Sequence, residues 1–171
     1  SSINIKLVDA IGNVPVNQDE AYRLTITPKA ITVEAVAERG VYWAMQTLYQ
    51  LKEEKGKKIR LQCGTITDWP AFRIRGFMQD VGRSYLSLEE LKREIAILSR
   101  FKINTFHWHL TENQAWRLES KIFPMLNDSA NMTRMAGKYY TLEEARELTK
   151  FCKAHQVLLI PEIDMPGHSA A

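Results

Sequence analysis

Several residues whose side chains could bind a metal or take part in catalysis lie close together in INTFHWHLTENQAW, residues 103–116. His107 and His109 could share a metal ion, because imidazole nitrogen is a common metal ligand. Such a site would draw on Glu112 and His168 as further ligands. However, no third ligand stands at a spacing typical of zinc sites, and the HExxH motif is absent. A metal site is therefore the weaker interpretation, and we expect no metal and no other cofactor.

The two histidines alternate with apolar residues, as the side chains of a strand do. Alternation places His107 and His109 on one face and Phe106, Trp108 and Leu110 on the other. A buried imidazole needs a hydrogen-bond partner. We therefore interpret the histidines as hydrogen-bonded groups in the wall of a core, while Glu112, at the exit of the strand, is better placed to meet a ligand.

Polar groups also follow two other apolar segments. Charged groups gathered at one edge of a sheet lose solvation, so a ligand site explains them better than stability does. Alternatively, each of these groups is a solvated polar residue at the rim of the sheet with no role in binding. The three clusters are Gln79-Asp80-Val81-Gly82-Arg83, Thr111-Glu112-Asn113 and Glu162-Ile163-Asp164-Met165-Pro166-Gly167-His168.

The elements that position these clusters alternate between strand and helix. Strands are predicted at 74–81, 103–110 and 157–164, and the third is apolar enough to be buried on both faces. SLEE at 87–90 and TLEE at 141–144 are capping boxes that start helices. This β-α-β-α-β order predicts parallel strands. The predicted buried faces are Leu88, Leu91, Ile95 and Leu98 on one helix and Leu142, Ala145, Leu148 and Cys152 on the other.

The first part of the chain has a different pattern. Alternating segments predict strands at 3–8, 22–27, 30–36 and 59–66, with the second and third forming a hairpin. A helix is predicted from Gly40, with one apolar stripe formed by Val41, Met45, Leu48 and Leu51. These features predict a small α+β domain at residues 1–69 and an α/β domain at residues 70–171.

Composition excludes some classes of partner. The 171 residues carry 23 basic and 20 acidic side chains, a net charge of +3, and the signs are mixed along the chain. Neither a nucleic-acid surface nor a membrane surface is indicated. No apolar run approaches the length of a membrane span. Cys63 and Cys152 lack metal or redox spacing, and we interpret both as buried small side chains.

Three long motifs resemble consecutive motifs of the family-20 glycoside hydrolases, the β-N-acetylhexosaminidases. The motifs are RGFMQDVGRSYLSLEELKREI, KINTFHWHLTENQAWRLE and LLIPEIDMPGHSAA. The upstream segment EAYRLTITPKAITVEAVAERGVYWAMQTLYQL resembles the small α+β domain that precedes the catalytic barrel in that family. The resemblance implies an α/β fold formed by the first three β/α units of a TIM (β/α)₈ barrel.

The resemblance also implies a function. Family members remove terminal N-acetylglucosamine or N-acetylgalactosamine from glycans with retention of configuration, and the acetamido oxygen of the sugar is the nucleophile. Arg83 matches the arginine that binds ring hydroxyls. Glu112 matches an acidic position, often aspartate, that helps bind the sugar and tune the acid. Asp164 and His168 match residues that orient the catalytic glutamate.

The catalytic Asp-Glu pair of the family is expected on a fourth strand, beyond residue 171. We therefore expect a chain truncated after the third strand, inactive alone, whose parent enzyme acts on N-acetylhexosamine-terminated glycans. Dimerisation or aggregation through exposed barrel edges is a further expectation. Family members are mostly exported or lysosomal, so the resemblance implies a periplasmic, extracellular or lysosomal protein. The alternatives are a non-catalytic sugar-binding module using Arg83 and Glu112, and a metal-binding module.

Overall fold

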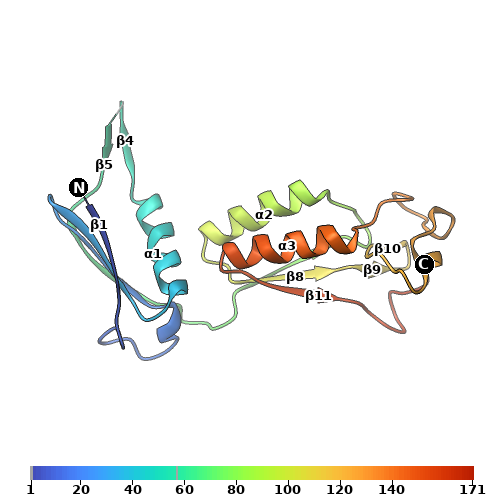
Figure 1. Ribbon diagram of the computed structural model, residues 1–171, viewed down its shortest axis with the longest axis horizontal. Helices are drawn as coiled ribbons and strands as arrows, with labels where there is room; N and C mark the ends of the chain where they lie inside the picture. Colours follow the sequence, from blue (N-terminus) through green and yellow to red (C-terminus); the bar gives the residue numbers. More distant parts are fainter. Residues whose placement is uncertain (1, 57) are drawn as a thin grey trace. The chain divides into compact units, whose positions relative to one another are not determined.

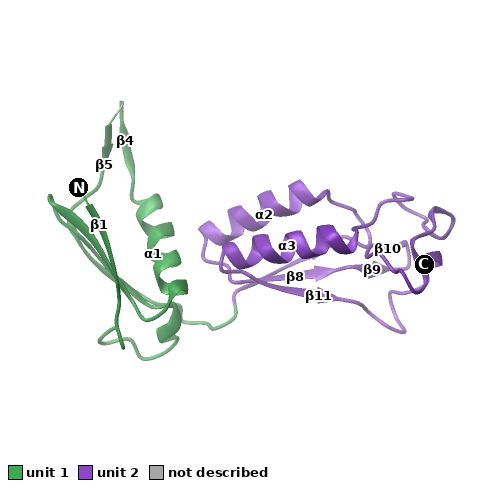
Figure 2. Cartoon of the chain, in the orientation of Figure 1, with its two compact units in different colours: residues 1–74 green, residues 75–171 purple. Residues whose placement is uncertain are grey.

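The computed structural model describes residues 2–56 and 58–171, and the chain forms two compact units. The units are residues 1–74 and residues 75–171, so the structural division falls a few residues after the predicted one (Figure 2). Each unit has its own hydrophobic core. They are described separately below.

The amino-terminal unit is a four-stranded sheet with one helix, as the alternation of its sequence predicts (Figure 1). The strand order is β1-β3-β2-β6, in which β2 and β3 form the predicted hairpin and β1 runs parallel to β3. The elements of the unit are β1 (Ser2–Leu7), the 3₁₀ turn η1 (Gln18–Glu20), β2 (Tyr22–Ile26), β3 (Ala30–Ala35), α1 (Glu38–Gln50), β4 (Glu53–Lys55), β5 (Lys58–Arg60) and β6 (Gly64–Asp68).

Two predictions for this unit were wrong. The single strand predicted at 59–66 is divided, because β5 pairs with β4 in a separate hairpin whereas β6 pairs with β2 in the main sheet. Cys63 lies in the segment between them and is exposed, whereas Cys152 is buried as predicted. Alternation alone could not show that two halves of one apolar segment have different pairing partners.

The predicted stripe of α1 is confirmed in part, because Leu48 is buried and Val41 and Met45 pack against the core. Trp43, Ala44 and Leu48 are buried, whereas Leu51 lies beyond the end of the helix and is partly exposed. The helix approaches the backbone so closely at Gly40 that a Cβ there would lie 2.4 Å from the carbonyl oxygen of Ala21. This contact fixes the rotation of the helix, and it depends on tertiary packing that helical spacing does not contain.

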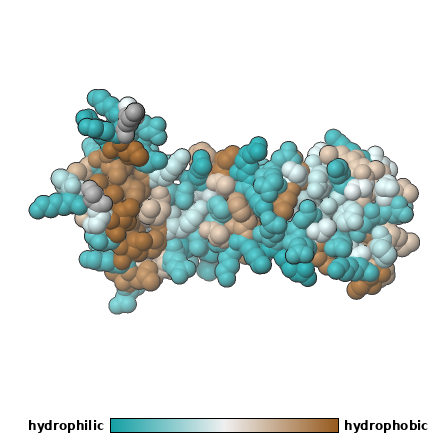
Figure 3. Space-filling model, turned by 45° about the horizontal axis from the view of Figure 1, so that its top comes forward, coloured by the Kyte–Doolittle hydropathy of each residue, from teal (hydrophilic) through white to brown (hydrophobic). Residues whose placement is uncertain are grey.

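One face of this unit keeps apolar surface exposed (Figure 3). Ile3, Ile5 and Leu7 of β1 are 50%, 56% and 64% exposed. They lie opposite Ile31, Val33 and Ala35 in the parallel register, which are buried. The apolar side of the sheet therefore extends beyond the part that is buried in the core.

The carboxy-terminal unit is a parallel three-stranded sheet of order β11-β8-β7, as the β-α-β-α-β pattern predicts. The predicted strand 103–110 is therefore the central one. The elements of this unit are β7 (Gly76–Asp80), α2 (Leu88–Arg100), β8 (Thr105–His109), β9 (Thr111–Glu112), β10 (Ala115–Trp116), the 3₁₀ turns η2 (Pro124–Asn127) and η3 (Ser129–Asn131), α3 (Leu142–Ala154) and β11 (Leu158–Glu162).

Both helices cover the same face of this sheet (Figure 1). Phe106, Trp108 and Leu110 form the core with residues of α2 and α3, which confirms the predicted alternation along β8. The prediction that 157–164 is buried on both faces was wrong. Leu158 and Ile160 are 57% and 41% exposed, because the helices cover only one side of this edge strand.

Capping boxes start α2 and α3, as the SLEE and TLEE motifs predict. At α3, the Thr141 hydroxyl accepts a hydrogen bond from the Glu144 N–H at 3.1 Å, and the Glu144 carboxylate accepts one from the Thr141 N–H at 2.8 Å. We expect Thr141→Ala to destabilise this unit by about 1 kcal/mol, because one amide at the helix start loses its partner. Thr141→Ser should retain most of the stability. Urea unfolding followed through the amide resonances of β8 would measure both.

Candidate active site

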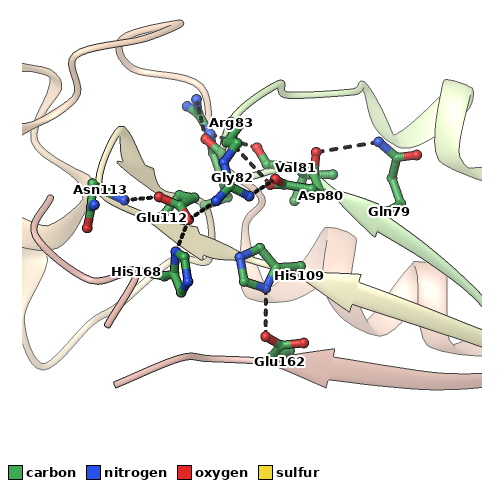
Figure 4. A network of polar contacts seen from close by, with 11 residues as sticks. Gln79, Asp80, Val81, Gly82, Arg83, His109, Glu112, Asn113, Glu162 and His168 are labelled. Carbon is green, nitrogen blue, oxygen red and sulfur yellow. Dashed lines mark hydrogen bonds and ion pairs between the residues drawn. The ribbon is translucent and has the colours of Figure 1, made fainter. Parts of the chain in front are cut away.

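The parallel register brings the polar strand ends together. Asp80 pairs with His109 across β7 and β8, and His109 pairs with Glu162 across β8 and β11. The carboxyl ends of the three strands therefore lie at one edge of the sheet, as the sequence predicts. The turns that follow the strands carry Arg83, Glu112 and His168 to the same edge (Figure 4).

Arg83 is held between two carboxylates. Its Nη1 contacts Asp80 Oδ2, and its Nη2 lies 2.5 Å from Glu112 Oε1. Its backbone N–H also donates to Asp80 Oδ1 at 3.0 Å, which fixes the turn after β7. The side chain remains 47% exposed. A guanidinium oriented on one side and open on the other can still donate hydrogen bonds to a ligand.

Glu112 is the buried centre of the site. Its side chain is 2% exposed, and its Oε1 contacts both Arg83 and the Nδ1 of His168, while Oε2 accepts from the Asn113 N–H at 2.7 Å. Burial by itself raises the pKa of this carboxyl, but the Asn113 amide, His168 and Arg83 hold it below its usual value. Glu112 is therefore ionised at neutral pH. Its length, greater than that of aspartate, is sufficient to reach both Arg83 and His168.

The close approach of two turns allows these contacts. A Cβ on Gly82 would lie 2.7 Å from the Cβ of Glu112 and 3.1 Å from its backbone nitrogen. No side chain larger than hydrogen fits between the turn after β7 and strand β9. Gly82 is therefore a requirement for the ion pair between Arg83 and Glu112.

A second cluster lies on the face of the sheet opposite to the helices. Glu162 accepts from His109 Nδ1 at 2.7 Å, and its other oxygen contacts His107 Nε2. Both histidines contact a carboxylate, as the interpretation requires, but only His109 is buried, whereas 38% of the His107 side chain is exposed. Burial raises the pKa of Glu162, but hydrogen bonds and charge interactions with the two histidines lower it below its usual value.

The four predicted site residues do not all contact one another. Arg83, Glu112 and His168 form one network, and His168 contacts Glu112 instead of Asp164. The Asp164 N–H donates to Thr111 Oγ1 at 3.0 Å, which ties the segment after β11 to β9. His168 has a φ of +53°, a left-handed conformation that is uncommon for residues other than glycine.

The metal ligands proposed from the sequence do not form one set. His107 and His109 contact Glu162, whereas Glu112 and His168 contact each other. A different group, His109, Glu162 and Asp164, has potential ligand atoms within 4.8 Å of one another. The hydrogen bond between His109 and Glu162 accounts for the proximity of that pair.

Sequence analysis missed the buried side chain of Arg117. It is fully buried, and it donates hydrogen bonds to backbone carbonyls of the turn after β7 and of the loop at 134–138. The contacts of Glu162 with His107 and His109 were also not predicted. Neither position has a local signal, because the side-chain partners are 15 to 55 residues away in sequence.

The paired carboxyls predict how stability depends on pH. The pKa values of Asp80, Glu112 and Glu162 are lower in the folded protein than in the unfolded chain. Their stabilisation is therefore complete above the unfolded values of about 4 and is lost as the pH falls through the folded values. Between pH 6 and pH 3, we expect Glu162→Gln to lose less stability than the wild type. Urea unfolding at each pH measures the slopes, with the exposed helix variant Glu143→Gln as the control.

The fold and the site together define a class of protein. It is an α/β protein with a network of polar side chains at the carboxyl ends of parallel strands, formed by one arginine, one buried glutamate and one histidine. Ligands of open and closed α/β sheets bind at this edge. No helix among residues 2–56 and 58–171 is long and apolar enough to cross a membrane.

Comparison with known proteins identifies the family. Residues 72–171 match the catalytic domain of glycosyl hydrolase family 20, and residues 1–69 match domain 2 of the same family. The chain belongs to glycosyl hydrolase family 20. It is 39% identical over 167 residues to a beta-hexosaminidase of Porphyromonas gingivalis and 37% identical over 171 residues to one of Vibrio furnissii.

Solved structures of the family have the same fold. The β-N-acetylhexosaminidase of Bacteroides fragilis matches 98% of this chain with a TM-score of 0.88 and 34% identity. The exo-β-N-acetylglucosaminidase of Vibrio harveyi, solved in complex with N-acetylglucosamine, matches 98% with a TM-score of 0.86 and 34% identity. The chain covers 34% and 28% of those two structures, and 21% and 28% of the P. gingivalis and V. furnissii proteins.

Proposed function

We propose that this chain is the amino-terminal part of a retaining exo-β-N-acetylhexosaminidase. Its substrates would be glycans that end in N-acetylglucosamine or N-acetylgalactosamine. The observation that carries the proposal is the network of Arg83, Glu112 and His168 at the carboxyl ends of parallel strands. The names of the relatives support the substrate class, since one solved relative holds N-acetylglucosamine. The three β/α units would be the first of a TIM (β/α)₈ barrel, which takes about 250 residues.

The chemistry of the site suits a sugar ring. The planar guanidinium of Arg83 is ionised and half-exposed, so it can donate two hydrogen bonds to neighbouring ring hydroxyls. Glu112 fixes its direction, so little conformational entropy is lost on binding. His168 completes the link from Glu112 toward the segment after β11. In the proposed mechanism the acetamido oxygen attacks the anomeric carbon, and a glutamic acid protonates the leaving oxygen.

The paired carboxyls at this edge do not supply that acid. A general acid must be protonated before the reaction, and its pKa is usually raised. Asp80, Glu112 and Glu162 all have lowered pKa values because arginine or histidine neighbours stabilise their charge. We propose that these 171 residues alone do not hydrolyse glycosides and that the acid is provided by a different part of the parent enzyme.

The dipeptide Asp19-Glu20 is not a substitute for the catalytic pair. Glu20 is 2% exposed in the amino-terminal unit, and its carboxylate accepts a hydrogen bond from Trp43 Nε1 at 2.7 Å. A buried carboxylate that holds a core tryptophan is a structural group.

Hydrolysis of p-nitrophenyl N-acetylglucosaminide tests the proposal. The complete enzyme should release p-nitrophenol, and the purified 171-residue chain should not. Release by the chain at a rate typical of glycosidases would disprove the inactivity of the fragment. No hydrolysis of either the gluco or the galacto substrate by the complete protein would disprove the proposed function.

A non-catalytic sugar-binding module remains the competing function. Calorimetric titration of the 171-residue chain with N-acetylglucosamine distinguishes it. A part of a pocket should give no measurable heat, whereas a complete binding module should give a saturable isotherm that Arg83→Lys weakens.

A further inference from the structure

The carboxy-terminal unit buries one cation without a carboxylate partner. Arg117 follows β10 and is 0% exposed. Its backbone N–H donates to the Leu110 carbonyl at 2.9 Å, and its carbonyl accepts from the Tyr140 N–H at 2.7 Å. The residue therefore lies between the end of the central strand and the start of α3. Burial lowers the pKa of its guanidinium.

The guanidinium donates to five backbone carbonyls and to one sulfur atom. Each nitrogen is used, so the five N–H groups of an arginine are matched to the surrounding oxygen atoms. The acceptors come from two segments, the turn after β7 and the loop before α3. They are Val81 O at 3.1 Å, Gly82 O at 3.2 Å, Arg134 O at 2.8 Å, Met135 O at 3.0 Å, Lys138 O at 2.6 Å and Met132 Sδ at 3.8 Å.

Stability alone gives little reason for this arrangement. Transfer of a charge from water to a protein interior is costly, and carbonyl dipoles compensate it less well than a carboxylate does. The loop that receives these contacts also contains two left-handed residues, Met135 at φ +48° and Gly137 at φ +73°. A conformation of this kind persists only when surrounding contacts determine it.

The two segments that Arg117 joins differ in their relation to the site. Val81 and Gly82 directly precede Arg83, and Gly82 packs against Glu112. The loop at 132–138 bonds instead to Arg117 and, through the Thr133 N–H, to the Gln114 carbonyl. Arg117 therefore holds the loop at 132–138 and the turn that carries Arg83 in fixed positions relative to each other.

We propose that Arg117 is a positioning residue for substrate binding, acting through the Val81-Gly82 turn on Arg83. It holds this turn and the loop at 132–138 as one rigid rim, which presents the guanidinium of Arg83 to the sugar. This inference rests on the proposed function, because it assigns Arg83 to the sugar ring. Loosening the rim should weaken substrate binding before it changes the chemical step.

The test is a double-mutant cycle in the complete enzyme, with Arg117→Lys and Arg83→Lys. Lysine keeps the charge of Arg117 but cannot bond to carbonyls on both sides at once. We expect Arg117→Lys to raise KM for p-nitrophenyl N-acetylglucosaminide about tenfold, with a smaller change in kcat. In the Arg83→Lys background, the same substitution should change KM less than twofold, because residues that act through one another are not additive.

A second variant covers the case in which Arg117→Lys does not fold. Gly137→Ala strains the left-handed position of the loop without a steric clash, since the nearest atom to the added Cβ is 3.9 Å away. It should raise KM severalfold, again only when Arg83 is present. Gly56→Ala introduces the same strain in the amino-terminal unit, at φ +64° with open space around it, and should leave KM unchanged.

Hydrogen exchange in the 171-residue chain tests the rim separately from activity. Arg117→Lys should increase exchange at the amides of residues 132–138 and leave β8 protected. KM effects that multiply in the double variant, or an unchanged KM in Arg117→Lys, would overturn the inference. An inactive wild-type enzyme would instead overturn the proposed function, and the exchange result would still report on the rim.

Discussion

Arg83→Lys should lower kcat/KM of the complete enzyme for p-nitrophenyl N-acetylglucosaminide by about 100-fold, since hydrogen bonds that involve a charged group contribute about 1.5–3 kcal/mol. The guanidinium contacts Asp80 and Glu112 with two nitrogens and remains open to solvent. Lysine has one nitrogen, so it cannot keep both carboxylates and also bind two sugar hydroxyls. The loss should appear mainly in KM, because this residue binds the ring and not the reacting bond.

The control for this experiment is Arg146→Lys. Arg146 is an exposed arginine of α3 in the same unit, so the same substitution there changes the charge geometry only at the surface. We expect its kinetic constants to equal those of the wild type. An Arg83→Lys enzyme with wild-type KM would show that the arginine has no role in sugar binding and would remove the main support for the proposed function.

Gly82→Ala should strongly destabilise the carboxy-terminal unit. The added methyl would lie 2.7 Å from Glu112 Cβ, 3.1 Å from Glu112 N and 3.1 Å from the Thr111 carbonyl carbon. Two of these atoms belong to the backbone of β9, so one segment must move. Overpacking of this kind costs about 1–3 kcal/mol, and the displacement should also separate Arg83 from Glu112.

Urea unfolding of the 171-residue chain, followed through the amide resonances of β8, measures this effect. Gly76→Ala is the control, because it places a methyl on β7, the strand that leads into this turn, with its nearest neighbour at an ordinary 3.8 Å. Equal stability of the two variants would show that the turn after β7 yields easily. In that case Gly82 would not be a requirement for the ion pair.

Local sequence features predicted a large part of the carboxy-terminal unit. The motifs SLEE and TLEE form capping boxes, because the groups that bond are only three residues apart. Alternation along β8 placed the histidines and the core residues on opposite faces, because successive side chains of a strand point to opposite sides. The order of strands and helices predicted a parallel sheet, and parallel strands necessarily bring their carboxyl ends to one edge.

Resemblance to a known family selected Arg83, Glu112, Asp164 and His168 from the polar residues at this edge. Three of them form a contact network, which local patterns could not predict. The rotation of α1, the division of the predicted strand at 59–66 and the exposure of β11 also depended on packing partners. Periodicity predicts which residues share a face, but it does not specify what covers that face.

Sequence by itself therefore determined the elements, their order and the edge at which the site lies, because these depend on hydrogen bonds and side-chain directions within a few residues. Only the tertiary structure decided that His168 contacts Glu112, that Gly82 must lack a side chain and that Arg117 joins two distant segments. These contacts join positions 15 to 56 residues apart, and their energies depend on burial and on distances between atoms. No local pattern encodes those quantities, because they exist only after the chain has folded.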